Sequence, residues 1–408
     1  MNIYKNSNEN SLSNNNCVVY FIPLLLLATF FYPLVVLIFI GALSPLLHPV
    51  LRNFYFYALL VFIIIFFSTL KPFGDIAEYL HVYHELNYNL IDVFGYSRFG
   101  DGLEFMFLAI MKFIGYISDG NDEVFLLSTY FLIVFFLSKI LKDVEKKYKL
   151  FLLSLFFFNL GFIEVTSYFL RQVLSVVVFL YAINERSFKK YIFFLLSVFF
   201  HMSAVVNVFI YAVYMIFGSK KYSYAKIVFS ILIGLLVVFF VVYNTPIYSV
   251  LLSKFTSVSG NDKFTRLPLN YIIITVVNIC FIIMIGKRSK CDDFNKILFC
   301  KECFLFLILL PFPALSNRLG MIIFGFYPYF ILPYLKAFER KGRSKYALLI
   351  CLYVVNLVPF LYLMYNVSLG NNMFTFLNNH PFTEGVYGMI DYILEAIDKG
   401  VNYINEGN

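Results

Sequence analysis

Charge is scarce in this chain of 408 residues. Asp, Glu, Lys and Arg together make up 14% of it, whereas 61% of the residues are hydrophobic, and the mean hydropathy is +0.80. So few charged side chains could not cover the surface of a soluble globule of this size. The scarcity of charge therefore excludes a soluble protein. It predicts an all-α, polytopic integral membrane protein, because the hydrophobic residues fall into runs near the roughly 20 residues that a helix needs to cross a bilayer.

Three further features are missing from the chain. The polar N-terminal residues contain Lys5 as their only basic residue and lack the basic region of a cleavable signal peptide. We therefore expect no signal peptide. Cys300 and Cys303 form a C-x-x-C pair with no second pair and no nearby histidine, so we expect neither a metal site nor a cofactor. No internal repeat is visible, which argues against a transporter built from two related halves.

Apolar segments recur along almost the whole chain and predict about 11 to 12 membrane segments. They lie near 18–44, 53–70, 103–118, 124–141, 150–168, 172–184, 191–217, 227–244, 269–286, 297–315, 319–335 and 346–365. We therefore expect a polar N-terminal tail (1–16), one polytopic membrane domain (17–366) and a polar C-terminal tail (367–408). Within this last tail, residues 384–403 have apolar side chains at helical spacing and predict an amphipathic helix on the outer surface.

Basic residues are concentrated in short turns between the apolar segments. The positive-inside rule places such turns in the cytoplasm, so the net charge of +8 reflects orientation and no nucleic-acid partner is expected. The loop at 71–103 is acidic instead, and we expect it to be external. If both placements hold, segment 103–118 dips into the membrane without crossing it. The basic turns are 142–149, 186–190, 220–226, 287–290 and 336–345.

Several ionisable residues interrupt or flank the apolar segments, although an arginine costs about 2.5 to 3.5 kcal/mol at a bilayer centre. Counted from the cytoplasmic turns at about 1.5 Å per residue, Arg171, Arg318 and Asp75 all fall at the outer ends of their segments. Segment 191–217 is too long for one upright span and too short for two. We therefore expect a broken or re-entrant helix with His201 near mid-depth. Together with carboxylates of the acidic loop, these side chains predict a cavity open to the outside.

Each of these residues has a simpler explanation when taken alone. An arginine at a helix end can snorkel to the interface, a single histidine is often a hydrogen-bonded core residue, and Asp75 and Glu104 could be ordinary loop carboxylates. Their shared side of the membrane is what favours a common function. A cytoplasmic N-terminus is the alternative orientation, and it would separate Asp75 and Glu104 from the cavity.

The order of these motifs resembles the EpsG/Wzy type of bacterial polysaccharide polymerase over roughly residues 50 to 335. The most specific part is an Arg-Gln pair followed, after a basic turn, by Phe-His-x-Ser. The absence of tryptophan and the abundance of Phe, Ile, Asn, Lys and Tyr also indicate AT-rich coding, which loci for surface polysaccharides commonly show. The motifs are Asp75-x-x-x-Tyr79, Glu104-Phe105-x-Phe107, Leu170-Arg171-Gln172, Phe200-His201-x-Ser203 and a late Arg318.

This resemblance implies an O-antigen or related surface polysaccharide polymerase, a membrane glycosyltransferase of the bacterial inner membrane. Such an enzyme moves the growing glycan from its undecaprenyl pyrophosphate carrier to a new lipid-linked repeat unit, with the active site facing the periplasm. The implied partners are the undecaprenyl pyrophosphate-linked oligosaccharide and membrane lipid, and a chain-length regulator protein is left open. A lipid-linked oligosaccharide flippase or transporter and an O-antigen ligase are the alternatives.

The residue types suit that chemistry. A pyrophosphate leaving group gains negative charge as it departs, which Arg171 and Arg318 could stabilise through bidentate hydrogen bonds. His201 is expected to act as base for the acceptor hydroxyl or as a pyrophosphate ligand. Asp75 and Glu104 are rival bases that would otherwise hold acceptor hydroxyls. The other residues expected to bind substrate are Tyr79, Gln172 and Ser203.

Overall fold

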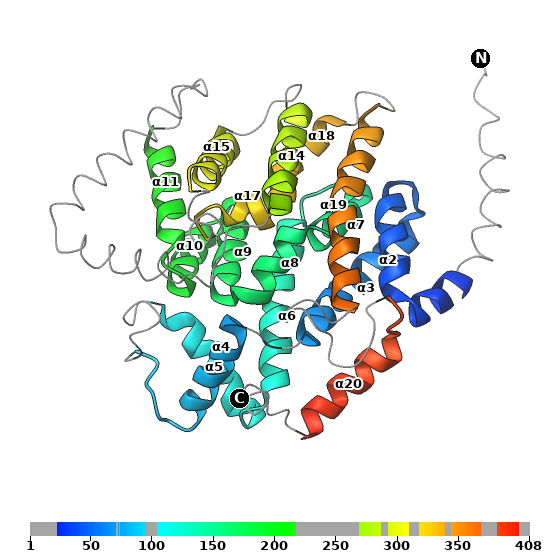
Figure 1. Ribbon diagram of the computed structural model, residues 1–408. Coiled ribbons are helices and arrows are strands. Elements are labelled where there is room, and N and C mark those ends of the chain that lie inside the picture. The colour runs from blue at the N-terminus through cyan, green and yellow to red at the C-terminus, as the bar shows by residue number, and fades with distance from the viewer. Residues whose placement is uncertain are drawn as a thin grey trace, which may run out of the picture.

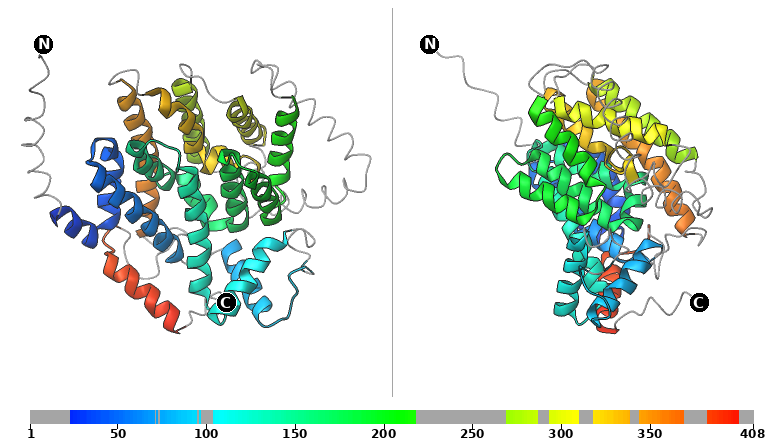
Figure 2. Two further views of the ribbon diagram at one scale, coloured as in Figure 1. Left: turned by 180° about the vertical axis from the view of Figure 1, so that it is seen from behind. Right: turned by 90° about the vertical axis from the view of Figure 1, so that its left-hand side faces the viewer.

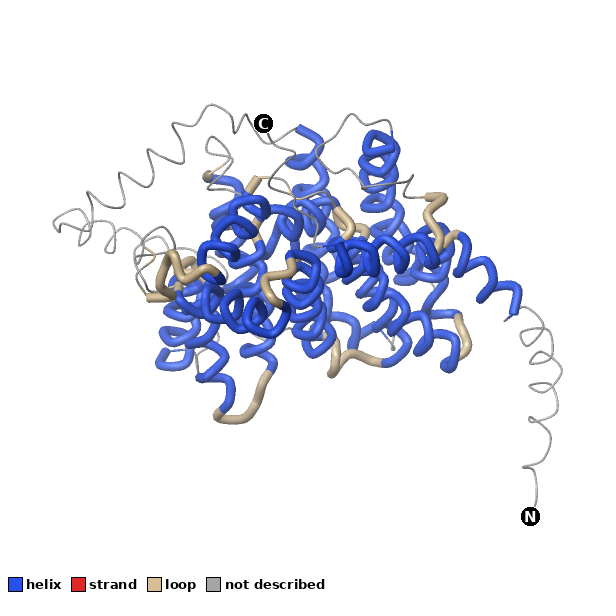
Figure 3. Tube along the Cα trace, turned by 90° about the horizontal axis from the view of Figure 1, so that it is seen from below, coloured by secondary structure: helices blue, strands red, loops and turns tan. Residues whose placement is uncertain are grey.

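A computed structural model of the chain describes residues 23–70, 72, 74–94, 96, 104–217, 269–286, 293–309, 318–338, 344–368 and 382–399. These residues are almost entirely helical and contain no strand (Figure 1, Figure 3). The prediction of an all-α polytopic membrane protein is therefore confirmed. The apolar segment expected at 227–244 lies outside the described residues.

The helices follow one another with short connections. One helix covers residues 23–31. The others are α2 (Pro33–Leu43), η1 (Ser44–Leu46), α3 (Pro49–Ser68), α4 (Asp75–Asn87), α5 (Phe105–Ser118), α6 (Asp122–Ile140), α7 (Lys146–Phe157), α8 (Leu160–Tyr168), α9 (Leu170–Asn184), α10 (Lys189–Phe200), α11 (Ala204–Phe217), α14 (Leu269–Gly286), α15 (Asp293–Ile308), α17 (Met321–Gly325), η2 (Tyr327–Ile331), α18 (Leu332–Phe338), α19 (Ser344–Ser368) and α20 (Val386–Lys399).

Three of the described helices are long and apolar enough to cross a bilayer by themselves. They are α3, α6 and residues Tyr346–Val367 of α19, and α7 with α8 forms a fourth span if the two are counted together. Shorter apolar helices, among them α5, α9 and α11, pack beside these spans or on one another. The membrane part is thus a bundle in which several helices stop inside the protein, where their ends must find hydrogen-bond partners within the chain.

The helix α9 packs against both α6 and α10. Phe136 near the end of α6 lies 5.7 Å from Tyr181 near the end of α9 between ring centroids, so these two helices run in the same direction. Phe193 at the start of α10 lies 4.8 Å from Tyr181, so α10 runs back along α9. The first turns of α6 and α9 and the last turn of α10 therefore lie at the same end of the bundle, opposite the basic turns.

The segment expected as one straight span over residues 150–168 is bent instead. Its two halves, α7 and α8, meet at an angle of 64°. Asn159 explains the bend, because its side-chain oxygen accepts a hydrogen bond from Gly161 N (3.1 Å) and starts a new helix. Its amide nitrogen donates to the backbone oxygens of Phe324 (3.1 Å) and Gly325 (2.9 Å), which fixes α8 against α17.

The expected break near His201 is confirmed. α10 ends at Phe200, His201 has an extended backbone (φ −160°, ψ 129°), and α11 begins at Ala204. Ser175 of α9 donates its hydroxyl to the oxygen of Ser197 (2.7 Å), so that the last turn of α10 keeps a partner for its carbonyl. The Ser175 hydroxyl also lies 3.5 Å from the backbone oxygen of His201, so the break packs on α9 one turn beyond Arg171.

The acidic loop contains a helix of its own, α4, which packs on α5 at one end of the bundle together with α20 (Figure 1, Figure 2). α5 has 14 residues and turns directly into α6 through Asp119 and Gly120, both at positive φ. This arrangement agrees with a segment 103–118 that dips without crossing. α20 covers most of the predicted amphipathic helix, and its Met389, Ile393 and Ala396 are buried.

Aromatic rings fill the space between α3, α7 and α8. Phe66 and Phe67 of α3 lie edge-on to Phe157 at centroid distances of 4.9 and 6.3 Å, and Phe67 also stacks on Tyr130 of α6 at 5.4 Å. Edge-to-face pairs of this kind add about 0.5 to 1.5 kcal/mol beyond the burial of their surface. They hold α3 in place, and α3 leads directly to the first residues of α4.

The close approach of α8 and α17 gives a test of this packing. A Cβ on Gly161 would clash with the backbone oxygen of Phe324, which cannot move without its helix. We expect Gly161→Ala to lower the free energy of unfolding by about 1 to 3 kcal/mol, the usual cost of overpacking. The measurement is thermal unfolding of the purified protein in detergent.

Gly388→Ala in α20 is the matched control. There the added methyl group meets only the carboxylate of Glu384, which can rotate away, and alanine favours a helix by about 0.5 to 1 kcal/mol over glycine. An unchanged unfolding temperature for Gly161→Ala would contradict the tight contact between α8 and α17.

Candidate functional site

Four helices begin around one point at one end of the bundle. Asp75 is the first residue of α4, Glu104 directly precedes α5, and Arg171 is the second residue of α9. The fourth helix, α11, follows the break that contains His201 and Ser203. The breaks and turns of the fold thus bring together residues from five separate stretches of the sequence, including Arg318 just before α17.

Arg171 lies between a carboxylate and a phenol. Its Nη1 atom is 2.5 Å from Oε2 of Glu104, and both side chains are largely buried, with 15% and 7% of their surface exposed. Its Nε donates to the hydroxyl of Tyr79 at 3.5 Å, and the guanidinium lies 5.5 Å from the centre of that ring. These contacts fix the plane of the guanidinium and compensate for its removal from water.

The second oxygen of Glu104 faces the break between α10 and α11. Oε1 accepts a hydrogen bond from the backbone N–H of Met202 at 2.8 Å and lies 3.9 Å from Nε2 of His201. One carboxylate therefore joins α5, α9 and the broken helix. Glu104 is buried, so loss of its carboxylate would leave the charge of Arg171 and the N–H of Met202 inside the protein without this partner.

The hydrogen bonds of His201 determine its neutral tautomer. Nδ1 accepts from the backbone N–H of Ser203 at 3.1 Å and lies 2.8 Å from the Ser203 hydroxyl. A backbone N–H can only donate, so Nδ1 carries the lone pair and the proton of neutral imidazole is on Nε2. His201 thus turns an N–H toward Glu104 rather than a free lone pair.

Tyr79 reports the electrostatic surroundings of the site. Burial raises the pKa of Tyr79 to about 12, while the charges of Arg171 and Arg318 act in the opposite direction and that of Asp75 adds to the rise. All three charged side chains are therefore close to this phenol. Tyr79 keeps its proton at neutral pH and serves as a hydrogen-bonding group, not as a base.

Arg318 is held through its backbone and its side chain. The amide nitrogen of Gln172 donates to the backbone oxygen of Arg318, and Gln172 is buried. The Arg318 guanidinium lies 5.3 Å from the centre of the Phe169 ring. Gln172 and Phe169, on either side of Arg171 in the sequence, thus position the second arginine beside the first.

The contacts above involve seven of the eight residues predicted from the sequence, and the charge of the eighth, Asp75, acts on Tyr79. The seven are Tyr79, Glu104, Arg171, Gln172, His201, Ser203 and Arg318. Two of these residues bind other residues of the site. Gln172 donates to the backbone oxygen of Arg318, and Ser203 contacts the imidazole of His201. Both therefore position the residue that they bind.

Sequence reasoning missed Lys301 and Glu302, which form a buried ion pair on α15. Lys301 also donates to the side-chain oxygen of Asn207 on α11 at 2.5 Å. Lys301, Glu302, Ser203 and Arg318 line a cavity of about 10 Å³, close to the least space that holds one water molecule. The signal was available, since a Lys-Glu pair inside an apolar run is as costly as the arginine that we did single out.

Within the part of the chain that the structure describes, no group of three or more His, Cys, Asp and Glu side chains is arranged to hold a metal ion. The chemistry open to this site is that of fixed charge and proton transfer. Two arginines can bind an anionic group, one carboxylate can accept a proton, and an imidazole N–H and a phenol can donate hydrogen bonds.

Comparisons with known proteins place the chain at the level of its family. No curated protein and no solved structure matches it. The model of the EpsG family matches residues 54–378, which make up well over half of the chain and include every residue of the site. The chain belongs to the EpsG family.

Proposed function

We propose that this membrane protein is an O-antigen or surface polysaccharide polymerase that works at the outer face of the bacterial inner membrane. Membership of the EpsG family is consistent with a polysaccharide polymerase, a glycosyltransferase-like activity, in general terms. The observation that carries the more specific proposal is Arg171, which binds both Glu104 and Tyr79, together with Arg318, whose charge also acts on Tyr79. This arrangement offers an anion site beside a proton acceptor.

The reaction transfers the growing glycan from one lipid carrier to another. A hydroxyl oxygen of the new lipid-linked repeat unit attacks the anomeric carbon of the growing glycan. The bond between that carbon and the phosphate oxygen breaks, and undecaprenyl pyrophosphate leaves with the electron pair. The hydroxyl proton passes to a base on the protein, so that charge and atoms balance without a metal ion or cofactor.

Arg171 and Arg318 bind the pyrophosphate in this scheme. The leaving group gains negative charge as the bond breaks, so hydrogen bonds from a guanidinium strengthen along the reaction. Arg171 is already oriented by Tyr79 and Glu104, and Arg318 by Gln172 and Phe169. Pre-oriented donors contribute more than flexible ones because they do not need to reorganise during the reaction.

We assign the base to Glu104 and a donor role to His201. Glu104 is an acceptor, whereas the neutral tautomer of His201 turns Nε2–H toward the site. That N–H can bind an oxygen of the pyrophosphate or of the acceptor. Asp75 and Tyr79 at the start of α4 then hold hydroxyl groups of the acceptor sugar, and the lipid carrier enters sideways between the apolar helices.

The first prediction concerns polymerisation in cells. When a strain that lacks this gene is complemented with Arg171→Ala, its lipopolysaccharide should show a single repeat unit on the core instead of a ladder. The variant Arg171→Lys keeps the charge but loses the planar fork, and we expect its activity to fall by about 100- to 1,000-fold. Gel electrophoresis of the lipopolysaccharide is the measurement, with immunoblots to confirm equal amounts of protein.

Arg186→Ala is the matched control, because Arg186 is exposed in the turn that follows the other end of α9. It should restore the full ladder. Loss of every repeat unit in the deletion strain would point to a flippase or a ligase. An unchanged ladder in that strain would rule out an O-antigen polymerase.

The second prediction separates Glu104 from His201. With purified protein and lipid-linked repeat units, Glu104→Gln should lower turnover by about 100- to 10,000-fold, the usual contribution of a general base. His201→Gln retains an N–H donor, so we expect a smaller loss of turnover. The reverse order of the two effects would return the role of base to His201.

A further inference from the structure

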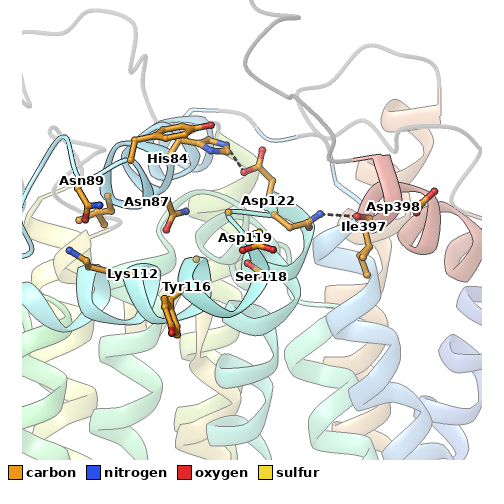
Figure 4. Close-up of a pocket in the computed structure, with 15 residues that line it drawn as sticks. His84, Asn87, Asn89, Lys112, Tyr116, Ser118, Asp119, Asp122, Ile397 and Asp398 are labelled. Carbon is orange, nitrogen blue, oxygen red and sulfur yellow. Dashed lines mark hydrogen bonds and ion pairs between the residues drawn. The ribbon is translucent and has the colours of Figure 1, made fainter.

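A second, larger cleft lies at the far ends of α4 and α5, two of the helices that begin at the site. It has a volume of about 850 Å³ and is bounded by the C-terminal turns of α4 and α5, the start of α6 and the end of α20 (Figure 4). In Figure 4, Asn89 and Lys112 lie at one end of the cleft, and Asp122 and Ile397 at the other. None of the residues assigned to the polymerase reaction lines it.

The walls of the cleft are fixed by polar contacts. His84 of α4 lies 2.7 Å from the buried Asp122 of α6, and this hydrogen bond raises the pKa of His84. Asn121 donates its side-chain amide to the backbone oxygen of Ile397 at 2.9 Å, which attaches α20. Asn87 lies directly over Gly115 of α5, where a Cβ would clash with its amide. The cleft is therefore a built feature and not a gap between loose helices.

The cleft and the site lie at opposite ends of α4 and α5. Tyr79, next to Arg171, and Asn87, in the cleft, are both on α4, and at about 1.5 Å per residue they are about 12 Å apart. Between them Tyr83 bonds the hydroxyl of Ser118 at 2.9 Å, which holds α4 and α5 together. A ligand in the cleft is thus at a fixed and short distance from the reacting groups.

The chemistry of the lining fits a polyhydroxyl ligand. Asparagine amides each offer two donors and an acceptor, which matches sugar hydroxyls that both donate and accept. The lining includes three asparagines, a serine and two exposed tyrosines, Tyr88 and Tyr116. A tyrosine presents a flat apolar face beside a polar tip, as the C–H faces and hydroxyls of a sugar require.

Other classes of ligand fit less well. Asp119, Asp122 and Asp398 outnumber the lining cations Lys112 and His84, which disfavours a phosphate group. The polar lining disfavours an acyl chain. In the described residues, these carboxylates do not form a group that could hold a metal ion.

We propose that this cleft binds the growing glycan of the donor substrate, a few sugars away from the carbon that reacts. The inference rests on the proposed polymerase function and adds a substrate subsite to it. A glycan held there keeps its reducing end near Arg171 between successive transfers, so that longer chains are made before release. The family match ends at residue 378, so α20 is a wall that lies beyond the matched region.

The chain offers unusually mild variants to test this inference. Asn89 and Asp119 both have positive φ (55° and 52°), so glycine removes each side chain without backbone strain. Lys112 is exposed on α5 and can be replaced by alanine. Phe113→Ala is the matched control, because Phe113 is exposed on the same helix but does not line the cleft.

The probe is the host strain's own polysaccharide, released from its lipid and cut into fragments of several repeat units. Binding to the full-length protein in detergent is followed by saturation-transfer NMR, with dextran as an unrelated glycan. We expect Asn89→Gly/Lys112→Ala/Asp119→Gly to weaken binding by about 10-fold or more, since three side chains that can bond to sugar hydroxyls are removed. Phe113→Ala and Arg171→Ala should bind as the wild type does. In cells the triple variant should still polymerise but give a ladder of shorter chains.

The outcomes separate this inference from the proposed function. Equal binding by the wild type and the triple variant, or no binding by the wild type beside a normal ladder, would overturn the glycan subsite alone. The triple variant could lose fragment binding while deletion of the gene leaves the ladder unchanged. This pair of results would support the subsite and reject the polymerase.

Discussion

The arrangement of the site depends on one buried carboxylate. Glu104 binds the guanidinium of Arg171 with one oxygen and the backbone of Met202 with the other, and so it joins three elements that are far apart in the sequence. Inside a protein such bonds are electrostatically stronger than in water, but each partner must be supplied by the chain itself. The break at His201 lies where Glu104 accepts the backbone N–H of Met202. Arg171 is tolerated where Glu104 neutralises its charge.

Elsewhere in the bundle polar groups meet the same requirement in pairs. Asn278 of α14 and Asn356 of α19, both fully buried, donate to each other's side-chain oxygens at 3.1 and 2.9 Å. Asn159 bonds two carbonyl oxygens next to α17, and Lys301 bonds Asn207. Hydrogen bonds between helices specify neighbours in an environment where apolar surface does not distinguish one helix from another.

The sequence was enough to predict which residues meet, but not how they meet. The cost of charge in a membrane and the length of a helix placed Arg171, Arg318 and Asp75 at one end. In the structure Arg171 contacts Tyr79, and the charges of Arg318 and Asp75 also act on that phenol. The bend at Asn159 could not be predicted in the same way, because an asparagine in an apolar run becomes a helix start only when another helix, here α17, offers it partners. The tautomer of His201 likewise depends on the N–H of Ser203, which only the local backbone conformation brings to Nδ1.

The gathering of helix starts at the site has an electrostatic consequence of its own. α4, α5, α9 and α11 all begin there, and the N-terminus of each helix carries about half a positive charge from its aligned peptide dipoles. The N–H groups of these first turns add to the positive charge of the two guanidinium groups, whereas Asp75 and Glu104 at the starts of α4 and α5 offset part of it. The fold itself therefore contributes a positive potential that belongs to the backbone. An anion bound at the site would be held by this potential as well as by the arginines, which orient it.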